Sequence, residues 1–201
     1  MVVLALWQIG NGYNVGEEAW RKSLFNAVSI LTGTGYASDN YPLWGPFAVA
    51  LFFLMGLIGG CAGSTSCSIK VFRFQLLFAS VKAQVRRIHA PHGIFQPRYQ
   101  GRTVPEDVMS SVMTFFVLFI VSLGVLSILL SMTGLDFITS VSGAASALAN
   151  IGPGLGETIG PAGNFSTLPD SAKWLLCAGM IIGRLELLAV YVLFTLNFWR
   201  P

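Results

Sequence analysis

The pattern of apolar and polar residues along the chain predicts several helices that cross a membrane. A helix needs about 20 predominantly apolar residues to span the hydrocarbon core of a bilayer. Three stretches approach or reach this length: residues 43–60, 112–132 and 174–199. Residues 1–9 resemble the end of a fourth span. The pattern therefore indicates an all-α membrane protein.

Two shorter apolar stretches lie between these spans, at residues 19–31 and 137–149. As helices, each would cross about half of the bilayer, because an α-helix rises about 1.5 Å per residue. Such a length is typical of re-entrant helices, which enter a membrane and turn back. Each stretch is followed by a glycine-rich segment, TGTGY at residues 32–36 and NIGPGLG at residues 150–156.

An internal repeat relates the two halves of the chain. A single offset of 117 residues pairs Ala27 with Ala144, Ser29 with Ser146, Leu31 with Leu148, and Gly35 with Gly152. The order of elements is also shared, so we predict two copies of span, pore helix, extended strand and span. The copies would occupy residues 1–90 and 107–201, with residues 91–106 as their connection.

Composition agrees with the membrane class. Hydrophobic residues make up 54% of the chain and charged residues only 10%, against about 25% charged residues in soluble domains. The three cysteines form no CxxC motif or Cys/His cluster, so neither a zinc site nor a disulfide framework is expected. Without a nucleophile–base pair or a cofactor motif, we expect no enzymatic activity, no cofactor and no nucleic acid partner.

The charged residues predict an orientation. Residues 70–102 contain seven of the chain's 12 lysines and arginines and no acid. The positive-inside rule places this connection in the cytoplasm, although the same run could dock a cytoplasmic partner. Six acids flank the glycine-rich segments on the other side: Glu17, Glu18, Asp39, Asp136, Glu157 and Asp170. They would place the glycine-rich segments toward the outer face of the membrane and concentrate cations there.

The glycine-rich segments have a composition that suits ion binding. Backbone at membrane depth must line water or be buried in protein. A strand with small side chains can turn its carbonyl oxygens toward an axis, where they replace the hydration shell of an ion. Glycine permits the φ values that this requires. Oxygen ligands suit a hard monovalent cation such as potassium, which would be the substrate and the only metal ion bound.

Two other interpretations of these glycines are weaker. A phosphate-binding loop needs GxxxxGK[ST] after a strand, and neither TGTGY nor residues 59–70 contain it. Helix packing through small residues is plausible for Gly56 and Gly60. It does not account for Gly35 and Gly152, which follow helices of half-membrane length and precede turn-rich sequence.

Two features within the predicted spans are candidates for gating. Glycines and hydroxyl residues in GGCAGSTSCS, residues 59–68, would loosen a helix, so the segment could form a gate, a hinge or a packing kink. Its candidate gating residues are Gly59, Gly60, Gly63, Ser64, Thr65 and Ser66. Arg184 is a costly charge within a span, and Glu186 would lie on another face of the helix. Arg184 could face the ion pathway or form an ion pair with another segment.

Together these segments resemble the C-terminal half of a Trk/Ktr/HKT-type potassium transporter, and most closely the membrane subunit of bacterial Trk potassium-uptake systems. The resemblance covers nearly the whole chain. It is carried by SILTGTGYASDNYP, by GGCAGSTSCSIKVFR, by NIGPGLG with the following IGPAGNFS, and by GRLELLAVYVLFTLNFW.

The resemblance implies four pore repeats around one potassium pathway, of which this chain holds the third and fourth, as half of a pseudo-four-fold, potassium-channel-like pore. The implied filter residues are Thr32, Gly33, Thr34 and Gly35 in the third strand and Asn150, Ile151, Gly152 and Pro153 in the fourth. Residues 59–68 would be the intramembrane gate, and Arg184 would project toward the pathway. Gly33 departs from the family pattern, which often has threonine there.

The resemblance also implies partners: the two remaining pore repeats, a second copy in a homodimer, and a cytoplasmic nucleotide-binding regulatory subunit. Two strands cannot close a four-fold ring. We therefore expect the chain to be a fragment of a longer protein, or two copies to associate. A second hypothesis is an inactive fragment or a non-transporting membrane assembly subunit.

Overall fold

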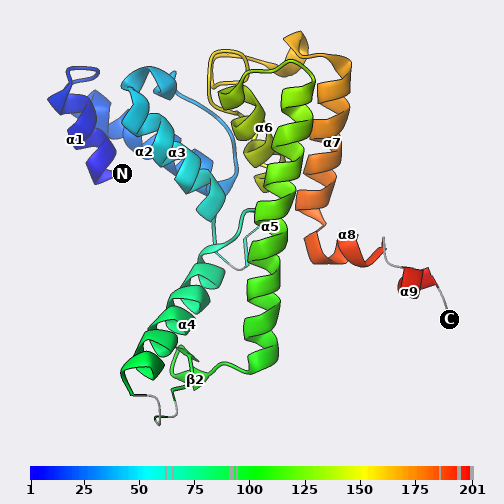
Figure 1. The fold of residues 1–201 in the computed structure, drawn as a ribbon. Coiled ribbons are helices and arrows are strands. Elements are labelled where there is room, and N and C mark those ends of the chain that lie inside the picture. Colours follow the sequence, from blue (N-terminus) through cyan, green and yellow to red (C-terminus); the bar gives the residue numbers. More distant parts are fainter. Residues whose placement is uncertain are drawn as a thin grey trace.

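The computed structural model of the chain describes residues 1–61, 63–64, 66–90, 93, 95–185, 187–193 and 196–199. This part of the chain is mostly helical, as the sequence predicts, with one short hairpin (Figure 1). The elements are α1 (Val2–Gly10), α2 (Glu17–Thr32), η1 (Tyr41–Trp44), α3 (Pro46–Ile58), α4 (Val71–His89), β1 (Arg98–Tyr99), β2 (Arg102–Thr103), α5 (Glu106–Met132), α6 (Phe137–Ala149), η2 (Phe165–Thr167), α7 (Asp170–Arg184), α8 (Leu187–Leu193) and α9 (Leu196–Trp199). Helices form at both stretches predicted to be pore helices, as α2 and α6.

The first half of the chain packs around an aromatic core. The ring of Phe52 in α3 lies 4.3 Å from that of Tyr41 and 5.9 Å from that of Trp44, between ring centroids. All three side chains are buried. The same core includes Ile151 and Leu155, which follow α6 in the second half. The segment after α6 therefore joins the two halves.

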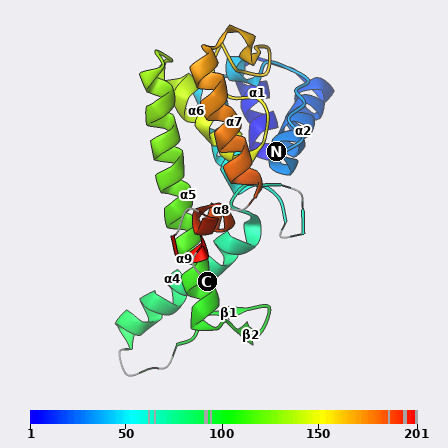
Figure 2. The same ribbon diagram turned by 90° about the vertical axis from the view of Figure 1, so that its right-hand side faces the viewer.

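The second half packs α5, α6 and α7 side by side (Figures 1 and 2). Leu130 of α5, Leu148 of α6 and Leu176 of α7 are buried in their common core. α6 begins at the N-cap residue Asp136, whose carboxylate accepts a hydrogen bond of 3.1 Å from the backbone N–H of Thr139. Hydrogen bonding to Thr139 holds the pKa of Asp136 below its ordinary value.

Among the described residues, α5 is the helix that is long and apolar enough to cross a membrane. It has 27 residues, and only 33% of its most apolar window is buried in the structure. Val117, Ile120 and Ile128 are each at least 60% exposed. A long helix with this much exposed apolar surface suits a lipid environment.

The apolar stretch at residues 43–60, one of the predicted spans, does not form one helix. The segment is divided between η1 and α3, which has 13 residues. Gly45 separates them with a φ of 97°, a conformation that side chains disfavour. Pro46 then begins α3, where its missing N–H would have no helical partner anyway. Gly59 ends α3 with a φ of 66°.

The prediction of a single helix at residues 174–199 is also wrong. α7 ends at Arg184, and α8 runs away from its axis (Figure 1). The hydrophobic pattern continues through this break, and residues 184–187 contain neither proline nor glycine. α7 has 15 residues, fewer than the roughly 20 that a span needs.

The basic region forms one end of the molecule. α4 carries the first part of this region, and the hairpin after it pairs Arg98 with Thr103. In Figure 2, the C-terminal end of α4 and the hairpin lie near one end of α5, and the connection from α6 to α7 lies at the other.

Candidate functional site

Two loops contain most of the predicted filter residues. The first loop, residues 33–40, follows α2, and the second loop, residues 150–164, follows α6. Thr32 is the last residue of α2.

The two loops touch through their backbones. A Cβ atom added to Gly35 would collide with the carbonyl oxygen of Ile151 and lie 3.2 Å from Cδ of Pro153. A Cβ atom added to Gly152 would lie 3.6 Å from the Cα of Gly35. Gly35 and Gly152 have φ values of 79° and 116°, which side chains disfavour. The structure therefore brings both predicted filter glycines into one place.

The first loop begins with a left-handed turn. Gly33 has a φ of 70° and its N–H donates to the carbonyl of Ile30 at 3.2 Å. The N–H of Thr34 donates to the carbonyl of Ser29 at 2.9 Å. The hydroxyl oxygens of Thr32 and Thr34 are 2.7 Å apart, and both residues are exposed. Glycine is favoured in such a turn because it lacks a Cβ atom.

The second loop begins with the same turn. Asn150 takes the left-handed position with a φ of 52°, and its N–H donates to the carbonyl of Ala147 at 3.2 Å. The N–H of Ile151 donates to the carbonyl of Ser146 at 3.1 Å. These two bonds connect the positions that correspond, at the offset found in the sequence, to those bonded in the first loop.

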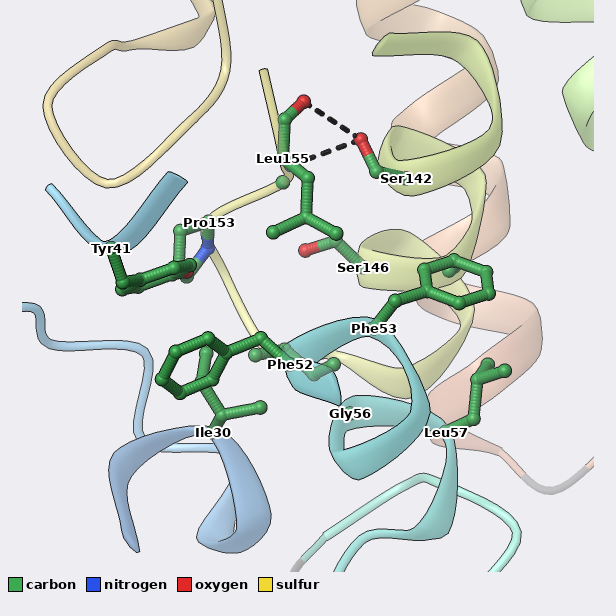
Figure 3. Close-up of a pocket in the computed structure, with 13 residues that line it drawn as sticks. Ile30, Tyr41, Phe52, Phe53, Gly56, Leu57, Ser142, Ser146, Pro153 and Leu155 are labelled. Carbon is green, nitrogen blue, oxygen red and sulfur yellow. Dashed lines mark hydrogen bonds between the residues drawn. The ribbon is translucent and has the colours of Figure 1, made fainter. Parts of the chain in front are cut away.

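Serine hydroxyls fasten the second loop to α6. The hydroxyl of Ser146 accepts from the N–H of Gly152 at 3.2 Å and donates to its carbonyl at 2.9 Å. The hydroxyl of Ser142 makes the same two bonds with Leu155, at 2.9 and 3.0 Å (Figure 3). Sequence analysis assigned no role to either hydroxyl. Two serines four residues apart, and so on one side of the helix, are the signal that could have indicated one.

The carbonyl oxygens of the second loop differ in what they face. The carbonyl of Gly152 is occupied by Ser146. The carbonyl oxygen of Asn150 lies 3.7 Å from the position of a Cβ on Gly33, and that of Ile151 faces Gly35. Asn150 and Ile151 thus present their carbonyls to the first loop, while Gly152 contributes its unusual backbone conformation.

Ser29 differs from Ser146, its counterpart in the repeat. Its hydroxyl is buried and has no hydrogen-bond partner among the described residues. The side chain itself is 6% exposed. The first loop is therefore not fastened by this hydroxyl.

A small cavity of about 20 Å³ lies behind the second loop (Figure 3). Its walls include Phe52 and Gly56 of α3 and Ser146 and Pro153 of the second half. A Cβ atom on Gly56 would lie 2.7 Å from Cδ1 of Ile151. Gly56 thus permits the close packing of α3 that the sequence suggested, here against the second loop.

The predicted gate approaches the first loop at Ser66. Ser66 is buried, and its hydroxyl oxygen lies 3.9 Å from the position of a Cβ on Gly33. Within the segment, the N–H of Gly60 donates to the hydroxyl of Ser66 at 3.4 Å. The hydroxyl of Ser68, which was not predicted, donates to the carbonyl of Gly56 at 2.7 Å. These bonds join the non-helical segment to the end of α3.

The other predicted gating residues differ in their surroundings. Gly59 is enclosed, since a Cβ atom there would collide with that of Ser68. Gly63 is exposed and has open space around it. The hydroxyl of Ser64 donates to the carbonyl of Cys61 at 2.6 Å. Thr65 lies outside the described residues.

Arg184 contacts the gate segment. Its Nη1 donates to Sγ of Cys67 at 3.4 Å, so the predicted barrier residue and the predicted gate are adjacent. The neighbouring Gly183 allows α7 to press against the end of α6, because a Cβ there would collide with the carbonyl of Leu148. Nδ2 of Asn150 donates to the carbonyl of Met180 at 3.1 Å and ties the second loop to α7. Glu186 lies outside the described residues.

A family model matches most of the chain. The model for the family TrkH, described as a cation transport protein, matches residues 10–199. The Trk system potassium uptake protein TrkI of Halomonas elongata is 48% identical over 202 residues, which cover 100% of this chain and 41% of that protein. TrkH of Escherichia coli K12, also named a Trk system potassium uptake protein, is 34% identical, with 98% of this chain and 40% of that protein covered.

A solved structure has the same fold. The crystal structure of the potassium transporter TrkH from Vibrio parahaemolyticus matches with a TM-score of 0.91 and 33% sequence identity. The match covers 99% of this chain and 42% of that chain. The chain thus spans about two fifths of the length of the relatives it matches.

Proposed function

Since the chain belongs to the TrkH family of cation transport proteins, we propose that it forms part of a potassium pathway across the bacterial inner membrane. The two loops are two strands of the selectivity filter in this proposal. Transport, and not enzymatic catalysis, is also the class that the sequence predicted.

The observation that carries the proposal is the backbone contact between the loops at Gly35 and Ile151. The backbones of the two loops approach here without side chains between them, and the carbonyl of Asn150 also faces the first loop. Carbonyl oxygens gathered in this way can replace the water around a potassium ion. The exposed hydroxyls of Thr32 and Thr34 add oxygen atoms beside the first loop.

Two loops supply half of a four-fold ring of oxygens. In the proposal, the other half comes from two further pore repeats, so that residues 1–90 and 107–201 are the third and fourth of four. The proposed assembly also includes a second copy of the protein and a cytoplasmic nucleotide-binding regulatory subunit. The proposed orientation places the basic region at residues 70–102 in the cytoplasm and the loops toward the periplasm, which agrees with the separation of these regions along α5 (Figure 2).

We assign the gate to the non-helical segment between α3 and α4. Ser66 lies next to the first loop, and Arg184 contacts Cys67. A cationic side chain beside the pathway raises the energy of a potassium ion there. Movement of Arg184 with this segment would therefore open or close the pathway.

The filter assignment is tested by rubidium and sodium flux into liposomes that contain the full-length protein. Gly35→Ser and Gly152→Ser should each lower rubidium over sodium discrimination by about tenfold, or ~1.4 kcal/mol of differential binding. Gly134→Ser is a matched control, because Gly134 also has a positive φ but lies in open space beyond α5. If both filter variants discriminate as the control does, the assignment is wrong.

The gate assignment is tested by Arg184→Ala in the same assay. The substitution should change the rate of rubidium flux while the protein still reaches the membrane in normal amounts. Loss of the protein from the membrane would instead support a structural role for Arg184.

A further inference from the structure

One face of α2 contacts the first loop at its turn and again near its end. Lys22, Asn26 and Ser29 are four and three residues apart, so they lie along one stripe of the helix. The loop meets these positions in reverse order. The N–H of Thr34 donates to the backbone carbonyl of Ser29, and then Ser38 bonds to the side chain of Asn26 and Asp39 pairs with Lys22. The stripe therefore follows the loop from its turn to its end.

Asn26 binds the first loop at Ser38, three residues after Gly35. Its Oδ1 accepts from the backbone N–H of Ser38 at 3.0 Å, and its Nδ2 donates to the hydroxyl of Ser38 at 3.0 Å. The same Nδ2 donates to the carbonyl of Lys22 at 2.9 Å. Asn26 is 0% exposed. Because a buried amide is costly unless it is hydrogen-bonded, these bonds strongly favour one position of the loop.

Lys22 holds the next residue of the loop. Its Nζ lies 2.9 Å from Oδ2 of Asp39, 2.9 Å from Oε1 of Glu18 and 3.2 Å from Oδ1 of Asn14. Burial opposes ionisation of Asp39, but hydrogen bonds from Lys22 and the backbone of Asn40 prevail and hold the pKa of Asp39 below its ordinary value. The pair is therefore charged at neutral pH.

The second copy of the repeat has no equivalent of Lys22 and Asn26. At the offset of 117 residues, α6 has Thr139 and Gly143 in place of Lys22 and Asn26. α6 holds its loop with serine hydroxyls that bond to backbone groups. Ser29 offers the first loop no such hydroxyl bond within the described part of the chain. Asn26 and Lys22 therefore hold the first loop against α2, as Ser142 and Ser146 hold the second loop against α6.

We propose that Asn26 and Lys22 are positioning residues that set ion discrimination by fixing the first loop against α2. The inference rests on the proposed filter function and adds two residues that touch no ion. A loop held at Ser29, Asn26 and Lys22 keeps its carbonyls at one spacing, and a spacing that suits potassium disfavours the smaller sodium ion. Without the hydrogen bonds between Asn26 and Ser38, the first loop could contract around a sodium ion.

The test uses Asn26→Ala in the full-length protein, with rubidium and sodium flux measured separately. Rubidium over sodium discrimination should fall about tenfold, as expected when ~1.4 kcal/mol of preference is lost, while rubidium flux continues. Asn11→Ala is the matched control, since the side chain of exposed Asn11 donates to the nearby carbonyl of Trp7, away from the first loop, and the variant should leave discrimination unchanged. A merely structural role would lower both fluxes and leave their ratio unaltered, which would overturn the inference.

A second set of variants keeps the test decisive if Asn26→Ala does not fold. Ser38→Ala removes the hydroxyl that accepts from Asn26 but keeps the backbone bond, and Lys22→Met removes the ion pair with Asp39. Each variant should therefore lower the rubidium over sodium ratio less than Asn26→Ala. The double variant Asn26→Ala/Ser38→Ala should resemble Asn26→Ala alone, because Asn26→Ala already removes the partner of the Ser38 hydroxyl. Unchanged ratios in Ser38→Ala and Lys22→Met would overturn the inference.

The outcome for Gly35→Ser separates the two proposals. If that variant loses discrimination while the Asn26, Lys22 and Ser38 variants keep it, the filter stands and the positioning residues are wrong. If Gly35→Ser and Gly152→Ser also keep it, the filter assignment itself has failed.

Discussion

The first and second loops make the same turn and meet at their glycines, but they are held to their helices in different ways. In the second loop, hydroxyls of Ser142 and Ser146 bond directly to the backbone. In the first loop, the longer side chains of Asn26 and Lys22 bond to Ser38 and Asp39, near the end of the loop. The backbone geometry is common to both loops, whereas the side chains that stabilise it are not.

This difference shows which features the repeat preserves. The left-handed residue and the glycine two positions later recur, because the turn and the close approach require particular φ values. A loop can be fastened by any donor and acceptor of suitable reach, so α2 and α6 use different residues. The following predictions compare matched positions in the two loops.

The largest loss of stability is expected from substitutions of the two glycines, and the losses should differ between them. Gly35→Ala should lower the free energy of unfolding by about 3 kcal/mol, because a positive φ is combined with a collision against Ile151. Gly152→Ala should cost about 1–2 kcal/mol, because its φ is strained but its Cβ has room. Thermal unfolding of the purified full-length variants measures both. Equal losses would show that the loops do not touch as described.

Substitution of the two serines paired by the repeat, Ser146 and Ser29, should also change stability by different amounts. Ser146→Ala removes both hydrogen bonds to the backbone of Gly152, at a cost of about 1–3 kcal/mol for the two bonds. Ser29→Ala removes a buried hydroxyl that has no partner among the described residues, so it should change stability by less than about 0.5 kcal/mol. Unfolding of the two variants under one set of conditions is the measurement. A substantial loss for Ser29→Ala would reveal a partner for its hydroxyl.

The smallest effect is expected at the left-handed position. Gly33→Asn introduces the residue that the second loop uses there, and the nearest atom to the added Cβ is 3.7 Å away. Asparagine tolerates this conformation, so the cost should stay below about 1 kcal/mol. Gly33→Val is the control, because a β-branched residue at positive φ is strongly disfavoured and should destabilise the protein more. Similar stability of these two variants would contradict the assigned turn.

Much of the fold could be predicted from hydrophobic length and spacing. The helices α2, α5 and α6 were predicted because each has a continuous apolar pattern and a clear end. The break at Gly45 and Pro46 is visible in the sequence, but it was included within a span because its neighbours are apolar. The end of α7 at Arg184 had no such signal, since apolar residues continue on both sides.

The site was predictable where it depends on backbone conformation. Gly35 and Gly152 were found from the repeat, because glycine at matched positions marks an unusual φ. The contacts of Asn26 with Ser38 and of Arg184 with Cys67 join residues 12 and 117 positions apart. Such contacts depend on how the helices pack, and the pattern of a single sequence does not contain that information.

The most direct test of the account is anomalous diffraction from crystals of the full-length protein grown in rubidium. We expect a rubidium peak where the two loops meet, on the open side of their contact and within reach of the carbonyl oxygens of Asn150 and Ile151 and the backbone of Gly33 and Gly35. Rubidium bound only elsewhere along the chain, with none where the loops meet, would contradict the claim that they form part of an ion filter.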